Sequence, residues 1–240
     1  DHMTRVRTAD FVSMSPELFE KVYLNPINRG GGDLRRNAAN PTPLGLVGFV
    51  IALTPLCCVL MGWHGTEANP PALIGAFYWF GGFLQAIAGI LEFFIGNTFP
   101  FIVLTSFGAF FFTYASTLTP AFAAASSYDS PADFHANFGF FPLFMGLLCL
   151  LYFLCSLRTN IVFAIIFFCL VLALAFLTAG HWYAAAANAT LAERMEIAAG
   201  ASAFVSAAMG WYLLASQMLQ AVDFPMQLPV GDLSTIVKGS

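Results

Sequence analysis

Polar side chains inside otherwise apolar sequence mark where this chain could do chemistry. Glu92 is the only acidic or basic residue deep within an apolar run, and Gln85 precedes it by seven residues. In a helix this spacing places both side chains on one face, with Gly89 leaving room between them. An ionisable group in hydrocarbon is costly unless it meets water or a partner, so Glu92 is expected to point inward. The pair could pass a proton and bind a carboxylate, or it could tie helices together with Asn97 as a partner.

A proline-rich stretch, Asn40-Pro41-Thr42-Pro43-Leu44-Gly45-Leu46, stands at the start of the first apolar run. Two prolines so close together favour extended backbone without amide donors, and Gly45 and Gly48 permit close approach of a helix or a ligand. The amides left free at such a helix start could attract an anion. The alternative is an ordinary helix start punctuated by proline.

Other candidate groups are a hydroxyl and several histidines. Thr54, beside Pro55, could offer its hydroxyl to a passing carboxylate or bond back to its own helix. His64, His135 and His181 map to the outer ends of the apolar runs, and histidine titrates near neutral pH. Their spacing specifies no metal site, so positions at the surface or at helix ends are favoured. The five cysteines lie in apolar runs without disulfide or zinc spacing, so neither a metal nor a cofactor is expected.

The elements that position these groups follow from composition. The chain has 240 residues, 59% of them apolar and only 9% charged, with a mean hydropathy of +0.77. Soluble domains carry about 25% charged residues, so this is a membrane protein. A net charge of −4 without a basic stripe argues against a nucleic-acid partner. No nucleophile with a base, metal-ligand cluster or phosphate-binding glycine loop is visible, so the chain is not expected to be an enzyme.

Six continuous apolar runs are long enough to cross a bilayer as helices. They cover about residues 43–63, 72–95, 100–123, 138–156, 160–182 and 196–219, and the connections are short apart from the polar segment 126–137. The sequence therefore predicts an all-α integral membrane protein with six transmembrane helices. Its expected parts are an N-terminal tail (residues 1–40, of which 1–3 resemble an expression remnant), a transmembrane domain (41–220) and a C-terminal tail (221–240).

Basic residues set the expected orientation. Nearly all of them fall on the side shared by the two termini, and only Arg194 falls on the other side. Both tails are therefore predicted to be cytoplasmic. Glu193 and Glu196 are then expected in an outer loop, beside a sequon at Asn188 that is too close to a helix end to be used.

The stretch from Asn40 to Leu46 matches the NPxPLGL signature of the acetate uptake transporter family, also called the succinate/acetate permease family. Further matches follow in the family's order along residues 22–238, and the segments that flank the spans resemble the fungal branch. These matches are Phe77-Tyr78-Trp79-Phe80-Gly81-Gly82, Gln85 to Glu92, Gly96-Asn97-Thr98-Phe99 and Thr105 to Phe110.

This resemblance implies a hexameric ring of six-helix protomers, each with its own path for acetate and related small carboxylates. It also implies an apolar constriction at Phe49, Phe107 and Leu170. Phe107 replaces the Tyr of bacterial relatives and so removes a hydroxyl. A drier gate, which opposes passage of hydrated ions, is the expected result.

The sequence thus predicts a plasma-membrane transporter or channel for acetate and other short monocarboxylates. Its expected partners are protons, membrane lipid and further copies of itself. One alternative is export of ammonium or ammonia, or permeation of another small neutral solute. A second alternative is a non-transporting acetate sensor or scaffold regulated through Ser13 and Ser15 of the N-terminal tail.

Overall fold

The computed structural model describes residues 38–66 and 70–233. Residues 1–37 of the predicted N-terminal tail, with Ser13 and Ser15, and residues 234–240 lie outside this part. Within the described ranges the chain is helical apart from one isolated β-bridge between Asn160 and Asp232. Six helical segments in these ranges are long and apolar enough to cross a membrane, so the predicted all-α, six-span fold is confirmed.

The spans follow one another along the chain with short connections, and the second is assembled from several helical pieces. The elements are α3 (Thr42–Leu60), η1 (Trp63–Gly65), η2 (Pro71–Leu73), α4 (Ile74–Ala76), η3 (Phe77–Leu84), α5 (Gln85–Phe94), α6 (Thr98–Leu118), η4 (Pro120–Phe122), α7 (Pro131–Phe138), α8 (Phe140–Ser156), α9 (Ile161–Ala185) and α10 (Ala189–Ala221).

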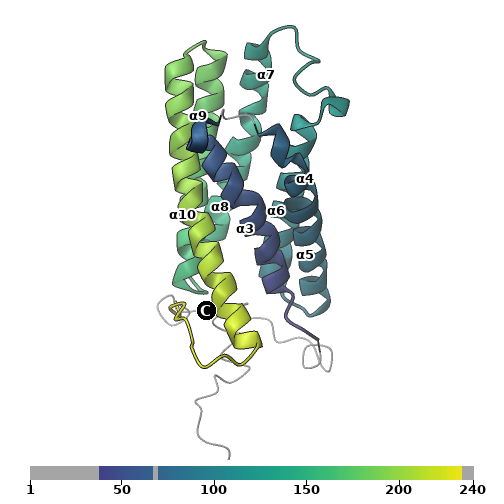
Figure 1. Cartoon of the computed structure of the whole chain (residues 1–240), viewed down its shortest axis with the longest axis vertical. Helices are drawn as coiled ribbons and strands as arrows, with labels where there is room; N and C mark the ends of the chain where they lie inside the picture. The colour runs from purple at the N-terminus through teal and green to yellow at the C-terminus, as the bar shows by residue number, and fades with distance from the viewer. Residues whose placement is uncertain (1–37, 67–69, 234–240) are drawn as a thin grey trace, which may run out of the picture.

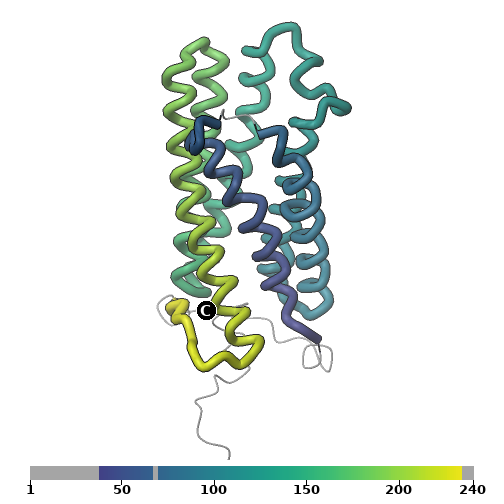
Figure 2. Tube along the Cα trace, in the orientation of Figure 1, coloured from purple at the N-terminus to yellow at the C-terminus, as the bar shows by residue number. Residues whose placement is uncertain are grey.

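The helices form an elongated bundle (Figure 1). α9 packs between α8 and α10, α10 packs on α3, α3 packs on η3 and α5, and α5 packs on α6. The tube view shows α3 running obliquely between α10 and the second span (Figure 2). The start of α3 and the end of the described chain lie at one end of the bundle, which we call the terminal end, and α7 lies at the opposite, distal end (Figure 1).

The second span contains a π-helical stretch, η3, directly before Gln85. Gly81 and Gly82 within it pack against α6, where a Cβ on Gly81 would lie 2.5 Å from Cγ of Phe111. A larger residue would push α6 away. Because π-helical turns shift the helical register, the faces of the span before and after η3 do not follow one continuous 3.6-residue pattern.

Two spans begin earlier than hydropathy predicts. The fourth begins at Pro131 instead of 138, and the sixth begins at Ala189 instead of 196. Side-chain oxygens of Ser130 and Asn188 accept from backbone amides and start these helices. Polar residues in their first turns end the apolar run although the helix continues. Glu196, predicted to lie in an outer loop, therefore lies in α10.

The third span ends earlier than predicted, at Leu118 instead of 123. Thr119 is extended and Pro120 starts the short helix η4, so the chain turns away there. Beyond this point the segment predicted as a polar connection is partly helical, because it contains α7.

The segment after α10 folds back over the terminal end of the bundle. Tyr212 Oη donates to Pro229 O at 2.7 Å, and Ser216 Oγ donates to Leu228 O at 3.1 Å. The amide of Ile161 donates to Gly231 O at 2.9 Å. This segment therefore ties the ends of α9 and α10 together.

Candidate functional site

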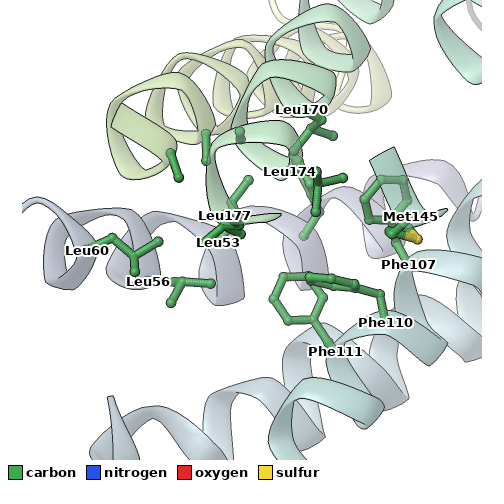
Figure 3. Close-up of a pocket in the computed structure, with 14 residues that line it drawn as sticks. Leu53, Leu56, Leu60, Phe107, Phe110, Phe111, Met145, Leu170, Leu174 and Leu177 are labelled. Carbon is green, nitrogen blue, oxygen red and sulfur yellow. The ribbon is translucent and has the colours of Figure 1, made fainter. Parts of the chain in front are cut away.

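The three residues predicted to form a constriction lie together in the bundle. Phe49 of α3, Phe107 of α6 and Leu170 of α9 line one narrow cavity of about 40 Å³. The rings of Phe49 and Phe107 meet edge to face with centroids 6.0 Å apart. Figure 3 shows the side chains that converge on this narrow cavity from α3, α6, α8 and α9. The other lining residues are Leu53, Leu56, Leu60, Phe110, Phe111, Met145, Ala173, Leu174, Leu177, Ala199 and Ala203.

Sequence reasoning missed a hydroxyl that lies beside this constriction. The ring centroid of Tyr152 in α8 is 6.5 Å from that of Phe107. Its hydroxyl lies 2.9 Å from Ser106 Oγ, the residue before Phe107. The hydroxyl absent from Phe107 is therefore present on a neighbouring ring. Nothing in the sequence links two positions 46 residues apart.

A wider cavity opens toward the distal end of the bundle. It has a volume of about 680 Å³, within the range of roughly 300–1,000 Å³ typical of small-molecule sites. Leu56, Leu60, Phe110 and Leu177 line both the wide and the narrow cavity. The wide cavity therefore lies directly beside the narrow one, with these four side chains forming the wall between them.

Two histidines meet in the wide cavity. Nδ1 of His135 in α7 lies 2.9 Å from Nδ1 of His181 in α9, and both side chains line the cavity together with Glu196. Both histidines lie near the ends of their helices, as predicted, with His135 in the last turn of α7 and His181 near the end of α9. The sequence does not predict that α7 packs against α9, which brings both rings to the wall of the wide cavity. His64, by contrast, is exposed after the end of α3.

Gln85 packs against α3 instead of either cavity. Its side chain is only 1% exposed, and Nε2 donates to Gly81 O at 2.8 Å. A Cβ on Gly48 of α3 would lie 2.9 Å from Cγ of Gln85. The space beside Gly89 is filled by Thr105 of α6. A role for Gln85 on a substrate path stays a prediction.

Glu92 forms a buried junction between three parts of the chain. It accepts hydrogen bonds from Thr42 Oγ1 at the start of α3 and from Asn97 Nδ2, the latter at 2.6 Å. The expectation that Glu92 lies deep in its span is wrong, because α5 ends only two residues later, at Phe94, and α6 begins directly after Asn97. The predicted tie to Asn97 is confirmed, and a role on the substrate path stays a prediction.

The proline-rich stretch is helical sooner than expected. Pro41 has right-handed helical angles and α3 starts at Thr42, so the predicted extended backbone is wrong. Proline is tolerated in a first helical turn because the amide there needs no helical partner. Asn40 Oδ1 accepts from the Thr42 amide at 3.1 Å, and the amide of Leu44 donates to Pro41 O at 3.0 Å.

The sequence predicts that a helix or a ligand approaches Gly45 and Gly48 closely, and in the structure neighbouring helices approach both. A Cβ on Gly45 would lie 2.6 Å from Leu104 of α6, and one on Gly48 would lie 2.5 Å from Phe80 O. Pro43 lies in the same first turn of α3. The proline-rich stretch thus brings α3 against the second and third spans.

Thr54 lies on the side of α3 that meets α10. Its hydroxyl donates to Val50 O at 2.6 Å and accepts from Trp211 Nε1 at 3.1 Å. The predicted bond back to its own helix is confirmed. Within residues 38–66 and 70–233 no three histidine, cysteine or acidic side chains come together as a metal site.

Six membrane-spanning helices around a wide cavity, with an apolar narrow cavity beside it, are typical of membrane proteins that move small solutes. The chain belongs to the GPR1/FUN34/yaaH family, whose model matches residues 31–235.

Relatives and a solved structure agree with this assignment. The chain is 43% identical to Protein alcS of Aspergillus fumigatus, over 93% of this chain and 86% of that protein. It is 31% identical to Acetate transporter protein patA of Aspergillus clavatus, over 82% and 79% of the two chains. The structure of the bacterial acetate channel SatP matches with a TM-score of 0.68 and 28% identity, over 81% of this chain and all of that one.

Proposed function

We propose that this chain moves acetate and other short monocarboxylates across a membrane, together with protons. The path runs from the wide distal cavity through the constriction of Phe49, Phe107 and Leu170 to the terminal end. The observation that carries this proposal is that the two cavities lie side by side and share four lining residues. The names of patA and SatP support acetate as the substrate.

The lining of the constriction favours a neutral acid over an anion. A buried carboxylate without a partner is much more costly than a neutral carboxyl group. The 14 residues that line the narrow cavity are all apolar. An acetate ion that meets this surface gains by taking up a proton first, which is why proton coupling belongs to the proposal.

The other polar side chains predicted to lie on the path are found at the terminal end or pack around α3. They are Asn40, Gln85, Glu92 and Asn97. We assign them the task of holding α3, α5 and α6 in position at that end of the path. Their buried hydrogen bonds support this assignment.

The membrane is proposed to be the plasma membrane, with both termini cytoplasmic, so that the wide cavity faces outward. The working assembly is proposed to be a hexameric ring with one path per protomer, and its function is transport and not catalysis. Large apolar side chains on the outside of the protomer, such as Phe94 (67% exposed) and Phe144 (64% exposed), support lipid or neighbouring protomers as the surroundings.

The experiment that tests this function measures labelled acetate uptake into proteoliposomes, with and without an inward proton gradient. Leu170→Ala is compared with Leu172→Ala, because both residues lie in α9 but Leu170 is 5% exposed and Leu172 is 37% exposed. Saturable uptake that the gradient accelerates is expected for the unmodified protein. Leu170→Ala should change the rate and its selectivity against larger acids, while Leu172→Ala should behave like the unmodified protein.

Methylammonium uptake is measured in the same vesicles. Uptake of methylammonium without uptake of acetate would replace the proposal with ammonium export. Acetate uptake no faster than through protein-free lipid, with acetate binding retained, would favour a sensor.

A further inference from the structure

The wall of the wide cavity contains two paired histidines. Nδ1 of His135 and Nδ1 of His181 lie 2.9 Å apart, and the ring centroids are 5.2 Å apart. Phe138 meets the His181 ring edge to face with centroids at 5.1 Å. Because both side chains come from packed helices, the pair is a built feature of the cavity wall.

The hydrogen bond between the two rings limits how many protons the pair can hold. An N–H···N bond requires one protonated Nδ1 and one Nδ1 lone pair. Two neutral rings satisfy this requirement, and so do one neutral ring and one imidazolium. Two imidazolium rings would place two N–H groups against each other and break the bond. The intact pair therefore takes up one proton and then carries one positive charge.

Titratable groups from the neighbouring elements face the same cavity. They are Tyr114 from α6, Tyr128 from the connection between α6 and α7, and Glu196 from α10. Among the described residues, α3 and α8 contribute only apolar side chains to this lining. Glu196 lies beside α9, with its Cγ 3.5 Å from a Cβ placed on Gly180. A carboxylate in the same wall opposes entry of an anion until the histidine pair is charged.

The chemistry of this wall suits a small molecule with one acidic head and a short apolar tail. A protonated pair offers charge-assisted N–H donors, which are the stronger partners for a carboxylate. Leu56, Leu60 and Leu177 lie further along the same cavity and accept an apolar tail. They also lead to the constriction, where only the neutral acid passes easily.

We propose that the His135–His181 pair binds short monocarboxylate anions and protonates them before they enter the constriction. An Nε2–H of the charged pair donates to a carboxylate oxygen. The N–H bond then breaks and an O–H bond forms, which leaves a neutral acid and a neutral pair. The Nδ1 hydrogen bond persists throughout, and water on the open side of the cavity returns the proton. This inference rests on the proposed function, since it names the proton donor for the same path.

The test uses the full chain in proteoliposomes and in detergent. His135→Gln and His181→Gln keep hydrogen-bonding capacity but remove titration. His64→Asn is the matched control, because His64 is exposed, does not line the wide cavity and has a left-handed φ of 58° that Asn tolerates. Initial rates of acetate uptake are measured between about pH 4 and 8, so that the range extends well below the pH at which a free histidine titrates.

For the unmodified protein, uptake should rise as the pH falls and then level off once the pair is protonated. Each Gln variant should lose roughly tenfold in rate on that plateau, as expected for the loss of one charge-assisted hydrogen bond. Its remaining uptake should follow the concentration of neutral acid without levelling off. His64→Asn should keep the unmodified profile.

Calorimetry in buffers of different ionisation enthalpy gives a second readout that does not depend on flux. Near neutral pH the unmodified protein should take up about one proton per bound acetate, and His181→Gln should take up none. If acetate is transported but both Gln variants keep the unmodified pH profile and proton uptake, the histidine assignment is overturned and the transport function stands. If the unmodified protein neither binds nor transports acetate, the transport function itself fails. Proton-linked binding of methylammonium in place of acetate would overturn the carboxylate assignment.

Discussion

The contact between α3 and the second span should not tolerate a methyl group at Gly48. A Cβ there would lie 2.5 Å from Phe80 O and 2.9 Å from Cγ of Gln85, whereas ordinary contact begins at 3.4 Å. Phe80 O belongs to the backbone, so it cannot rotate away. Gln85 is restrained by its own hydrogen bond to Gly81 O. Gly48→Ala therefore requires α3 to move by several tenths of an ångström.

The extra methyl group overpacks this contact, and overpacking of a close-packed site lowers the free energy of unfolding by about 1–3 kcal/mol. Alanine also stabilises a helix by about 1 kcal/mol relative to glycine. A control variant must therefore replace a helical glycine with alanine at a position where no clash results. Gly75 provides that control, because a Cβ there would meet nothing within 4 Å. The two variants should differ by about 1–3 kcal/mol in the free energy of unfolding, or roughly 2–12 °C in melting temperature.

Thermal unfolding of the purified protein in detergent, followed by intrinsic fluorescence, measures this difference. Gly48→Ala should melt below the unmodified protein and Gly75→Ala at or slightly above it. Equal melting temperatures for the two variants would refute the packing of α3 against η3 and Gln85 described above.

Three further predictions concern the terminal end of the bundle. Thr42→Val should lower stability by about 1–3 kcal/mol, because buried Glu92 loses a hydrogen-bond donor, and an unchanged melting temperature would contradict this. Gln217→Met should raise the melting temperature, because both polar atoms of this buried side chain lack a partner in the described part of the chain. Acetate uptake should stay unchanged. Lost uptake would instead make Gln217 a substrate contact. Gly231→Ala should loosen the segment after α10, because φ is 67° and a Cβ would lie 2.7 Å from Ile161; limited proteolysis should then cut that segment faster, and an unchanged rate would contradict the prediction.

The sequence predicts the number of spans because each apolar run must satisfy its backbone within lipid. It fails at the starts of the fourth and sixth spans, where polar residues such as Asp133, Glu193 and Arg194 interrupt the apolar run although the helix continues. A capping pattern could have corrected the first of these. Ser130-Pro131-Ala132-Asp133 combines an N-cap serine, a proline at the first helical position and an acidic third residue. Hydropathy alone treats such a turn as a loop.

The pairing of His135 with His181 could not be predicted from the sequence, because it depends on how α7 packs on α9. Glu92 could be predicted to need partners, and it has them at the terminal end in Thr42 and Asn97. The polar groups that the sequence singled out therefore hold helices together, whereas the two histidines that it placed at the surface or at helix ends meet in the wall of the wide cavity.

The positions of the polar side chains limit where a transported acid could exchange a proton. The narrow cavity is lined only by apolar side chains, so it offers no group that could give or take a proton. On the proposed path, an acid is already neutral when it arrives from the wide cavity, where the histidine pair lies. The proposed coupling to protons therefore resides beside the constriction and not within it. Widening the constriction with Leu170→Ala should change the rate and size selectivity but leave the pH profile in place, whereas His181→Gln should change the pH profile and leave size selectivity in place.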